Sequence, residues 1–471
     1  MLIRILCLLL LVQACAPSLP VKKDKAMDLP PSFPESVKSA PEEASSAEIP
    51  WKDFFQDPKL NGMIDTALNG NQEINILQQE IDIANNEIMA RQGEYLPKVT
   101  ANASGGLEKT ERFDTKGASE PLKFGRAGLM STWEIDIWKK LRNASKAAYM
   151  SYLGSVEGRR FAVTLLVSEV ANTYYELMAL DNQLELVDSY VEILKKITHF
   201  VSLQQQAGRV TSLPVKRFEA EALKNQARQY ELKQQIVMTQ NKLNALLGRF
   251  PQKVQRNSKD FLTMTLSHLN SSVPSKILDY RPDVRQAGFE LEAAKLSVDV
   301  ARARFYPSLS IDAEAGYENF NSKHLTENVY STFYGVAAGL SAPLLNRKAI
   351  KADYFSANNK QIQAVYHYEQ SLIKAYSEVI NQLSMIKNFD TVYEMKSKQV
   401  EALNHAIEIS NTLFKAARVD YIEALLTQRD ALEAKLELVE AKKRQLTAYV
   451  DLYKALGGGW KGLKETTESN Y

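Results

Sequence analysis

The sequence predicts a mainly α-helical fold that is internally duplicated and that supplies four strands to a membrane β-barrel. Long proline-free stretches allow very long helices, short islands alternate apolar and polar residues, and matching motifs recur at an almost fixed spacing. The net charge of the 471 residues is +2, which gives no reason to expect a nucleic acid as a partner.

The N-terminus resembles a bacterial lipoprotein signal. Arg4 precedes the apolar run Ile5–Val12, and Val-Gln-Ala comes directly before Cys15. The pattern is similar to a lipobox, so we expect residues 1–14 to be removed as a signal peptide and Cys15 to carry lipid. A generic signal peptide with an incidental cysteine is the alternative. Ala16 stands where lipoproteins held in the inner membrane often carry Asp, which favours the outer membrane.

The rest of the chain divides by composition and repetition. Residues 15–50 are rich in Pro, Ser, Lys and Glu without apolar periodicity, which predicts an extended, lipidated tether. We expect a first repeat over 51–248, a connecting segment over 249–282, a second repeat over 283–457 and a polar tail over 458–471. No later segment reaches the ~18 uninterrupted apolar residues of a spanning helix, so strands would have to cross any bilayer.

The first long helix has a seven-residue apolar repeat. Two lines form this repeat: Val163, Val170, Leu177, Leu184 and Val191, and Leu166, Leu180, Val187, Leu194 and Val201. The alternation predicts a coiled-coil seam, and a helix over Lys139–Gln206 would be on the order of 100 Å long. A solvent-exposed structural coiled coil is the alternative interpretation of this segment alone.

Two islands, near 97–137 and 307–345, have a two-residue period instead. Four segments show it: Lys98–Glu108, Ala127–Ile137, Ser308–Glu318 and, more weakly, Tyr334–Leu344. Runs of ~10 residues with one apolar and one polar face are typical of membrane-barrel strands, although a soluble sheet is the alternative for any single run. The polar face carries acidic residues predicted to line a cation-favouring lumen: Glu134, Asp136, Asp312 and Glu314. They would equally suit any water-facing strand position.

The number of strands predicts an oligomer. Single-chain barrels start at about eight strands, and open strand edges cannot face lipid because their backbone groups would stay unpaired. If the four strands lie in a membrane, several copies of the chain must therefore pool them.

The two halves of the chain match each other. The motif Ser-Glu-Val-x-Asn at 168–172 returns at 377–381, 209 residues later, and Leu247-Gly248 returns as Leu456-Gly457 at the same spacing. The spacing predicts one unit used twice: helix, hairpin, long helix, tight turn, helix.

The tight turns carry helix-ending and helix-starting residues. In the first turn Gly208 is expected to end a helix, and Thr211 or Ser212 to cap the next. In the second, Asp420 and Glu423 resemble a capping box.

Three stretches resemble outer-membrane efflux factors of the TolC type, and the resemblance covers nearly all of the chain. They are Pro274–Val284 with its Asp-Tyr-Arg-Pro-Asp core, Trp51–Asn71, and Thr132–Trp138. With a lipobox in front, the chain is most similar to the lipoproteins that serve drug or metal efflux pumps.

The resemblance implies a TolC-like homotrimer that shares a twelve-stranded barrel and a helical α-barrel. It implies no catalysis and no cofactor besides the lipid on Cys15. The implied partners are a periplasmic adaptor, a proton-driven inner-membrane pump and outer-membrane lipid. A duct for type I protein secretion, a non-conducting coiled-coil lipoprotein and an adaptor remain as alternatives, and the cargo is not determined.

The resemblance also places the periplasmic gate at the two turns. The candidate gate and adaptor-contact residues are Gly208, Arg209, Thr211, Ala417, Arg418, Asp420, Glu423, Leu426 and Asp430. Leu426 stands where the family often has an aspartate, so either Asp430 supplies the acidic ring or the constriction is apolar. Surface charges that cap a helix are the alternative for each charged residue.

Other functional motifs were not found. The five histidines show no metal-ligand spacing, and the sequence holds no nucleophile motif. Both cysteines lie within the first fifteen residues, so the remaining chain has no thiolate metal site. No enzymatic activity is expected.

Overall fold

The fold consists of two compact units, each built from segments far apart in the sequence. The computed structural model describes residues 16–19, 21, 23, 30, 49–108, 122–266, 280–319, 331–342, 347–415 and 421–460. The sheet unit comprises Met1–Met27, Gln79–Val156 and Gln286–Glu369, and the helical unit Asp28–Gln78, Glu157–Arg285 and Gln370–Tyr471. Each unit therefore takes segments from both sequence repeats.

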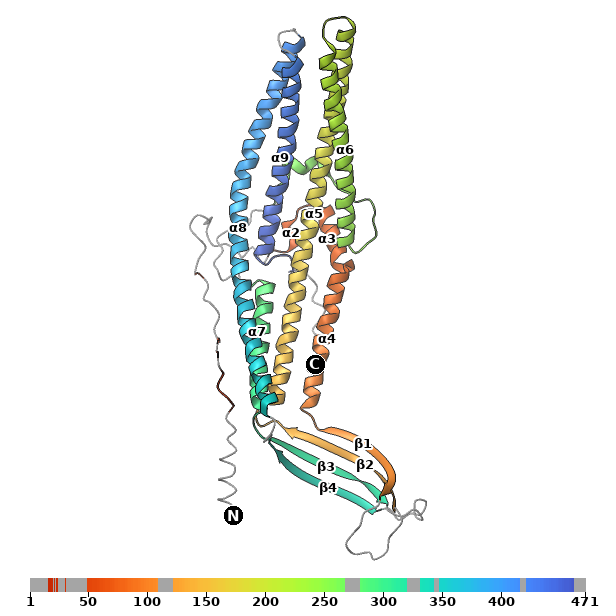
Figure 1. Ribbon diagram of the computed structural model, residues 1–471, viewed down its shortest axis with the longest axis vertical. Helices are drawn as coiled ribbons and strands as arrows, with labels where there is room; N and C mark the ends of the chain where they lie inside the picture. Colours follow the sequence, from red (N-terminus) through yellow and green to blue (C-terminus); the bar gives the residue numbers. More distant parts are fainter. Residues whose placement is uncertain are drawn as a thin grey trace, which may run out of the picture. The chain divides into compact units, whose positions relative to one another are not determined.

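The sheet unit contains a four-stranded antiparallel sheet (Figure 1). Its strands pair in sequence order: β1 (Lys98–Glu108), β2 (Leu122–Ile135), β3 (Ser308–Asn319) and β4 (Ser331–Ser341). The predicted bounds of β1 are confirmed, and β3 is one residue longer than expected. β2 begins earlier and ends two residues earlier than expected, and β4 is displaced by three residues toward the N-terminus. The small residues of β4 give its ends little contrast between apolar and polar positions.

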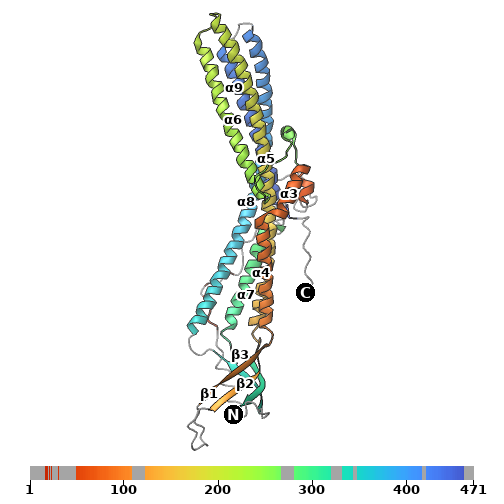
Figure 2. The same cartoon turned by 90° about the vertical axis from the view of Figure 1, so that its right-hand side faces the viewer.

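Long helices make up most of the rest of the fold. The structure contains α4 (Gln72–Glu94), α5 (Lys140–Gln206), α6 (Ser212–Leu246), α7 (Pro282–Ala303), α8 (Arg347–Lys415) and α9 (Tyr421–Ala455). In the helical unit, α5 runs beside α6 and α8 beside α9 (Figures 1 and 2). Among the described residues, no helix combines the length and apolar character needed to cross a membrane.

The predicted coiled-coil seam of α5 is confirmed. Its members are buried apart from Leu184, which is partly buried against the same cluster. Residues of α6 and α9, including Phe218 and Leu432, complete the apolar cluster around the far half of the seam. The seam therefore holds helices of both repeats together, because apolar residues every 3.5 positions form one continuous stripe.

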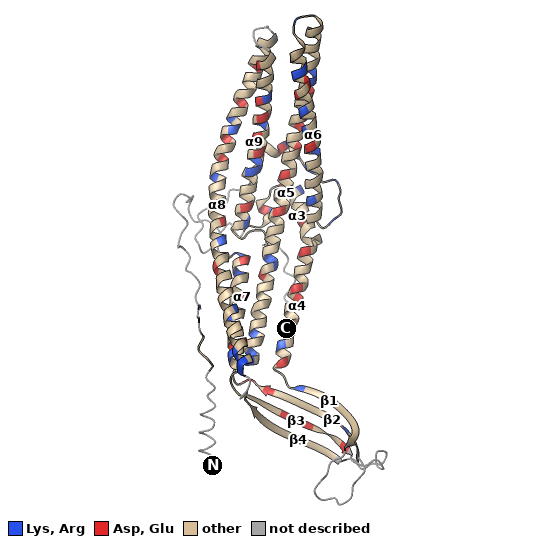
Figure 3. Ribbon diagram, in the orientation of Figure 1, with Lys and Arg blue, Asp and Glu red and all other residues tan. Residues whose placement is uncertain are grey.

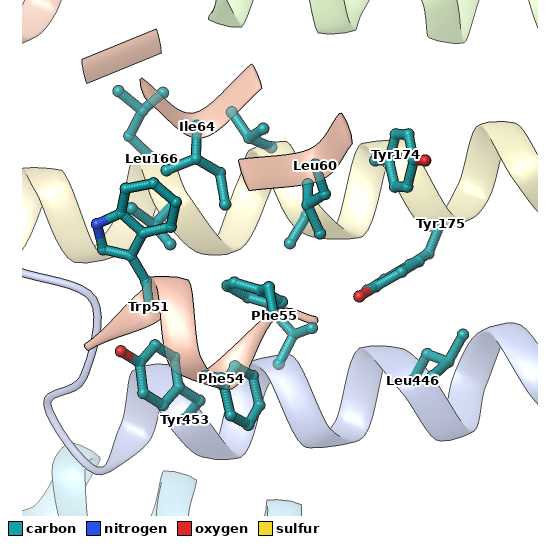
Figure 4. Packing of buried hydrophobic residues seen from close by; sticks show 14 of the residues in the cluster. Trp51, Phe54, Phe55, Leu60, Ile64, Leu166, Tyr174, Tyr175, Leu446 and Tyr453 are labelled. Atoms are coloured by element: carbon teal, nitrogen blue, oxygen red, sulfur yellow. The ribbon is translucent and has the colours of Figure 1, made fainter. Parts of the chain in front are cut away.

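The largest core of the helical unit lies where short N-terminal helices meet α5 and α9 (Figure 4). The short helices are α2 (Trp51–Phe54) and α3 (Pro58–Gly70), and the 3₁₀ segment η3 (Ser258–Thr263) adds Phe261 to the same core. Phe54 stacks on Tyr453 of α9 with ring centroids 4.3 Å apart. Asp57 caps α3 and accepts a 2.7 Å hydrogen bond from the Tyr174 hydroxyl of α5.

A buried arginine fixes the entry to α7. The Arg281 side chain is 3% exposed, and its guanidinium contacts Asp283 at 2.7 Å and Glu378 of α8 at 2.9 Å. It also donates a 2.9 Å hydrogen bond to the Ala455 carbonyl at the end of α9. Burial opposes the charge, but Asp283 and Glu378 outweigh it and raise the pKa of Arg281. Within the helical unit, one side chain thus joins the start of α7, the middle of α8 and the end of α9.

Replacing Arg281 with methionine should lower the free energy of unfolding by about 3 kcal/mol, because the two carboxylates lose their buried counterion. Urea denaturation followed by circular dichroism measures the change. Arg228→Met on the exposed side of α6 is the control and should stay within about 0.5 kcal/mol of the wild type. Equal effects of the two substitutions would contradict a structural role for the Arg281 contacts.

Candidate functional site

The sheet has one apolar face and one polar face. Side chains alternate along a strand, and the observed register aligns the alternation across all four strands. The large side chains of the apolar face that are exposed are Val99, Leu107, Leu129, Tyr317, Tyr334, Val336 and Leu340. An exposed apolar surface of this kind is typical of a face that meets lipid or another protein.

The polar face brings together three of the four predicted lumen residues. Glu134 lies opposite Ser310, and Asp312 lies opposite Thr132. Glu314 pairs with Arg126 of β2 at 2.9 Å, and Glu134 pairs with Lys140 at 2.6 Å. The acidic character of this face is therefore partly neutralised by neighbouring cations. Arg126 was missed because β2 was predicted to begin one residue after it.

The prediction that Asp136 belongs to the same polar face is wrong. Asp136 follows β2, and its side chain is only 2% exposed. Its carboxylate accepts hydrogen bonds from the backbone N–H groups of Leu141 at 3.1 Å and Arg142 at 2.9 Å. It also forms an ion pair with the Arg142 guanidinium at 3.2 Å. Burial alone would raise the pKa of Asp136, but the hydrogen bonds from Arg142 and Leu141 lower it. Asp136 holds the first turn of α5 instead.

The first helical turn has the predicted glycine stop. Gly208 has a φ of +70°, a conformation that glycine adopts without a Cβ penalty. Its N–H donates to the Gln205 carbonyl and the Arg209 N–H to the Gln204 carbonyl, both at 2.9 Å. Thr211 occupies the N-cap position of α6, but its side chain makes no capping hydrogen bond, so capping by this side chain is not confirmed.

The second turn is described only from Tyr421 onward. The candidates Ala417, Arg418 and Asp420 lie outside the described residues, as does Cys15. Glu423 is exposed in the first turn of α9, and Leu426 is partly buried. Asp430 is exposed and contacts Arg429 at 3.0 Å, so its charge is paired within the helix.

A buried tyrosine near this acidic position escaped the sequence analysis. Among the described residues, the Tyr190 hydroxyl has no hydrogen-bond partner, although its ring belongs to the cluster between α5, α6 and α9. Burial raises its pKa, with a further contribution from Glu221 of α6. The sequence offered little signal, because Tyr190 directly precedes a residue of the coiled-coil seam and looks like ordinary core.

The portions of the chain that the structure describes contain no cluster of three or more His, Cys, Asp or Glu residues that could hold a metal ion.

Comparison with known proteins assigns the chain to a family. The model of the outer membrane efflux protein family matches residues 63–249 and again residues 273–458. The chain belongs to the outer membrane efflux protein family. The two matches begin 210 residues apart, which confirms the internal duplication. This outer membrane efflux protein is a channel component of an efflux system, and its family consists of channels rather than enzymes.

Known proteins resemble this family member over almost its whole length. The probable efflux pump outer membrane protein TtgC of Pseudomonas putida is 26% identical, covering 93% of this chain and 91% of TtgC. The cation efflux system protein CusC of Escherichia coli is 24% identical, covering 96% and 98%. The open-state MtrE outer membrane channel of Neisseria gonorrhoeae has the same fold, with a TM-score of 0.81, 22% identity, and coverage of 94% and 98%. The predicted TolC-like fold is confirmed.

Replacing Asp136 with alanine should destabilise the protein by about 1 kcal/mol at pH 7, because the start of α5 loses its acceptor. The folded-state pKa of Asp136 lies below the ordinary value of 3.8, so its contribution is present above that value and is lost as the pH falls further. Urea denaturation of wild type and variant at pH 7 and at pH 3 measures the difference. Asp299→Ala, an exposed position on α7, is the control and should show no comparable loss. A difference that grows on acidification would contradict the assignment.

Proposed function

We propose that this chain is the outer-membrane channel subunit of a tripartite efflux system, a passive conduit that works as a homotrimer. The observation that carries the proposal is the four-stranded sheet, which has an exposed apolar face and two edge strands, β1 and β4. An edge strand in lipid needs a partner for every backbone N–H and C=O group. Pairing β1 of one copy with β4 of the next supplies these partners, and three copies would close a ring of twelve strands.

A stripe on α6 supports assembly between copies. Leu223, Tyr230 and Val237 recur every seven residues, and their exposed fractions are 62%, 71% and 49%. A coiled-coil line that is exposed in one copy has the spacing needed to pack on a helix of another. This stripe lies on the same helix as the buried Phe218 and Leu232, so α6 would use one side within its own chain and another between chains.

The segment after Cys15 supports a lipid anchor at the helix–sheet junction. Ala16 and Leu19 pack against the cluster of Phe305 and Tyr354 in the sheet unit. Farther along α8, Asn358 donates a 3.0 Å hydrogen bond to the Val21 carbonyl, and Lys23 pairs with Glu369 at 2.7 Å. Phe305 lies just before β3, so this arrangement would bring a lipid on Cys15 to the membrane end of the helices. We therefore propose cleavage after Ala14 and acylation of Cys15.

The helical turns are the proposed contacts of a periplasmic adaptor that links the channel to a proton-driven pump. Gly208, Arg209 and Thr211 would contribute from the first turn, and Ala417, Arg418, Asp420 and Glu423 from the second. Within the channel, Leu426 and Asp430 would line the constriction, and Glu134, Asp312 and Glu314 the lumen. Because Asp430 contacts Arg429 and Glu314 contacts Arg126, we expect weaker cation preference than the acidic residues alone would give.

Tyr230→Glu should reduce trimer formation and conductance by about tenfold or more, because it places an unpaired charge in the proposed interface. Size-exclusion chromatography with light scattering measures the trimer, and planar-bilayer recording measures conductance. Gln235→Glu adds the same charge elsewhere on the exposed surface of α6 and should behave like the wild type. A wild-type chain that never conducts would overturn the channel proposal. Conducting trimers of Tyr230→Glu would instead remove α6 from the interface.

Cys15→Ser should abolish incorporation of radiolabelled palmitate into the mature protein, because the thiol that would carry the lipid is absent. The other cysteine of the chain, Cys7, lies within the predicted signal peptide, and Cys7→Ser should leave the label unchanged. Labelling of growing cells followed by gel autoradiography measures both. Label retained in Cys15→Ser would contradict acylation at this residue.

A further inference from the structure

Basic residues gather where the helices of the sheet unit join the sheet (Figure 3). The register pairs Ile135 with Leu309 and Ser308 with Ser341, so β1 and β3 begin at the end where β2 and β4 finish. Three of the helix ends that meet this edge, those of α5, α7 and α8, carry the basic belt: Lys139, Lys140, Arg142, Lys146, Arg302, Arg304, Arg347, Lys348 and Lys351. The same three segments carry three acidic residues: Asp136, Asp299 and Asp353. The end of α4 leads into β1 at this edge and carries Glu87 and Glu94, which both pair with Arg91.

Ion pairs within the sheet unit neutralise only part of the basic belt. Lys140 and Arg142 pair with the acidic groups at the end of β2, and Arg304 pairs with Asp353 at 3.0 Å. Arg302, Lys348 and Lys351 are exposed, and no carboxylate among the described residues pairs with them. Positive charge therefore remains uncompensated on the surface formed by the end of α7 and the start of α8.

Amphipathic aromatic side chains connect the part of the basic belt at the start of α5 with the part at the end of α7. Trp138, which is 46% exposed, stacks on Tyr306 with ring centroids 4.6 Å apart and donates a 2.8 Å hydrogen bond to the Pro307 carbonyl. Trp133 similarly donates a 3.0 Å hydrogen bond to the Tyr95 carbonyl. Trp and Tyr collect at the boundary between lipid headgroups and hydrocarbon because they have one apolar and one polar end.

We propose that the basic belt binds the phosphate groups of anionic phospholipids in the adjoining membrane leaflet. This inference rests on the proposed function, which places the apolar face of the sheet in the bilayer. Acyl chains would lie along that face, and their headgroups would reach the level of Trp138 and the basic belt. Arginine and lysine donate charge-assisted hydrogen bonds to phosphate, and the uncompensated cations favour lipids with net negative charge over zwitterionic ones.

The N-terminal segment would provide a second contact with the membrane, beside the basic belt. Ala16 and Leu19 pack against the cluster that contains Phe305, and Ile350 packs against the same cluster. Phe305 and Ile350 are the chain neighbours of Arg304 and Lys351. A lipid on Cys15 would therefore enter the bilayer next to the uncompensated charges. The covalent anchor would supply apolar attachment, and the basic belt would select the neighbouring headgroups.

The experiment measures lipid selection by the full-length, acylated protein. Wild type is reconstituted into vesicles of phosphatidylcholine and phosphatidylglycerol, extracted in mild detergent, and the retained lipids are quantified by mass spectrometry. We expect several-fold enrichment of phosphatidylglycerol over the vesicle composition, falling as NaCl is raised. The triple variant Arg302→Gln, Lys348→Gln, Lys351→Gln should return the ratio to that of the vesicles.

A matched control variant removes the same number of positive charges from the helical unit. Lys196→Gln, Arg228→Gln and Lys387→Gln are all at exposed helical positions and should retain the wild-type enrichment. Wild type without enrichment, or equal enrichment in both triple variants, would overturn the inference.

Planar-bilayer conductance of the same preparations separates this result from the proposed function. Conducting trimers without lipid enrichment would refute the basic belt as a headgroup site and leave the channel intact. A wild-type chain that neither inserts nor conducts would refute the channel and the inference together.

Discussion

A sheet of four strands leaves two rows of backbone hydrogen-bonding groups at its edges, and the need to pair them governs how this chain can work. In water an open edge is a risk of aggregation, whereas in lipid it is too costly to exist. Doubling the helix–hairpin unit raises the strand number to four without removing the edges. In the proposed channel, further copies of the chain therefore pair with both edges so that the apolar sheet face is compatible with a bilayer.

The same duplication makes the two repeats inseparable. Each compact unit combines segments of both repeats, so neither repeat has a complete core of its own. Arg281 illustrates this dependence, because it stands just before the second repeat and contacts the end of α9 and the middle of α8. Phe54 of α2 likewise stacks on Tyr453, near the other end of the chain, and the Tyr453 hydroxyl donates a hydrogen bond to the Ile49 carbonyl.

Apolar periodicity serves two purposes in the helical unit. The line of residues on α5 is buried within one chain, whereas the stripe containing Tyr230 on α6 is exposed. In the sheet unit, charged residues predominate at the end of the sheet. Carboxylates there neutralise some of the cations, and Arg302 and Lys348 are left available to bind headgroups. Packing between helices and contact with headgroups therefore use different residues, so substitutions can separate stability from assembly and from lipid selection.

The sequence by itself determined the periodic features. Alternation located β1 and β3 to within a residue, and the heptad repeat located α5, because these signals arise from which side of a local element is buried. The constant spacing of motifs determined the duplication. Tertiary structure alone decided the roles of individual polar residues. Asp136 continues the two-residue alternation of Glu134 in the sequence. The strand nevertheless ends before Asp136, and its carboxylate accepts hydrogen bonds from the first turn of α5 instead. The pairing of Glu314 with Arg126 and of Arg281 with Glu378 joins residues distant in sequence, and such partners are fixed only when the strands and helices come together.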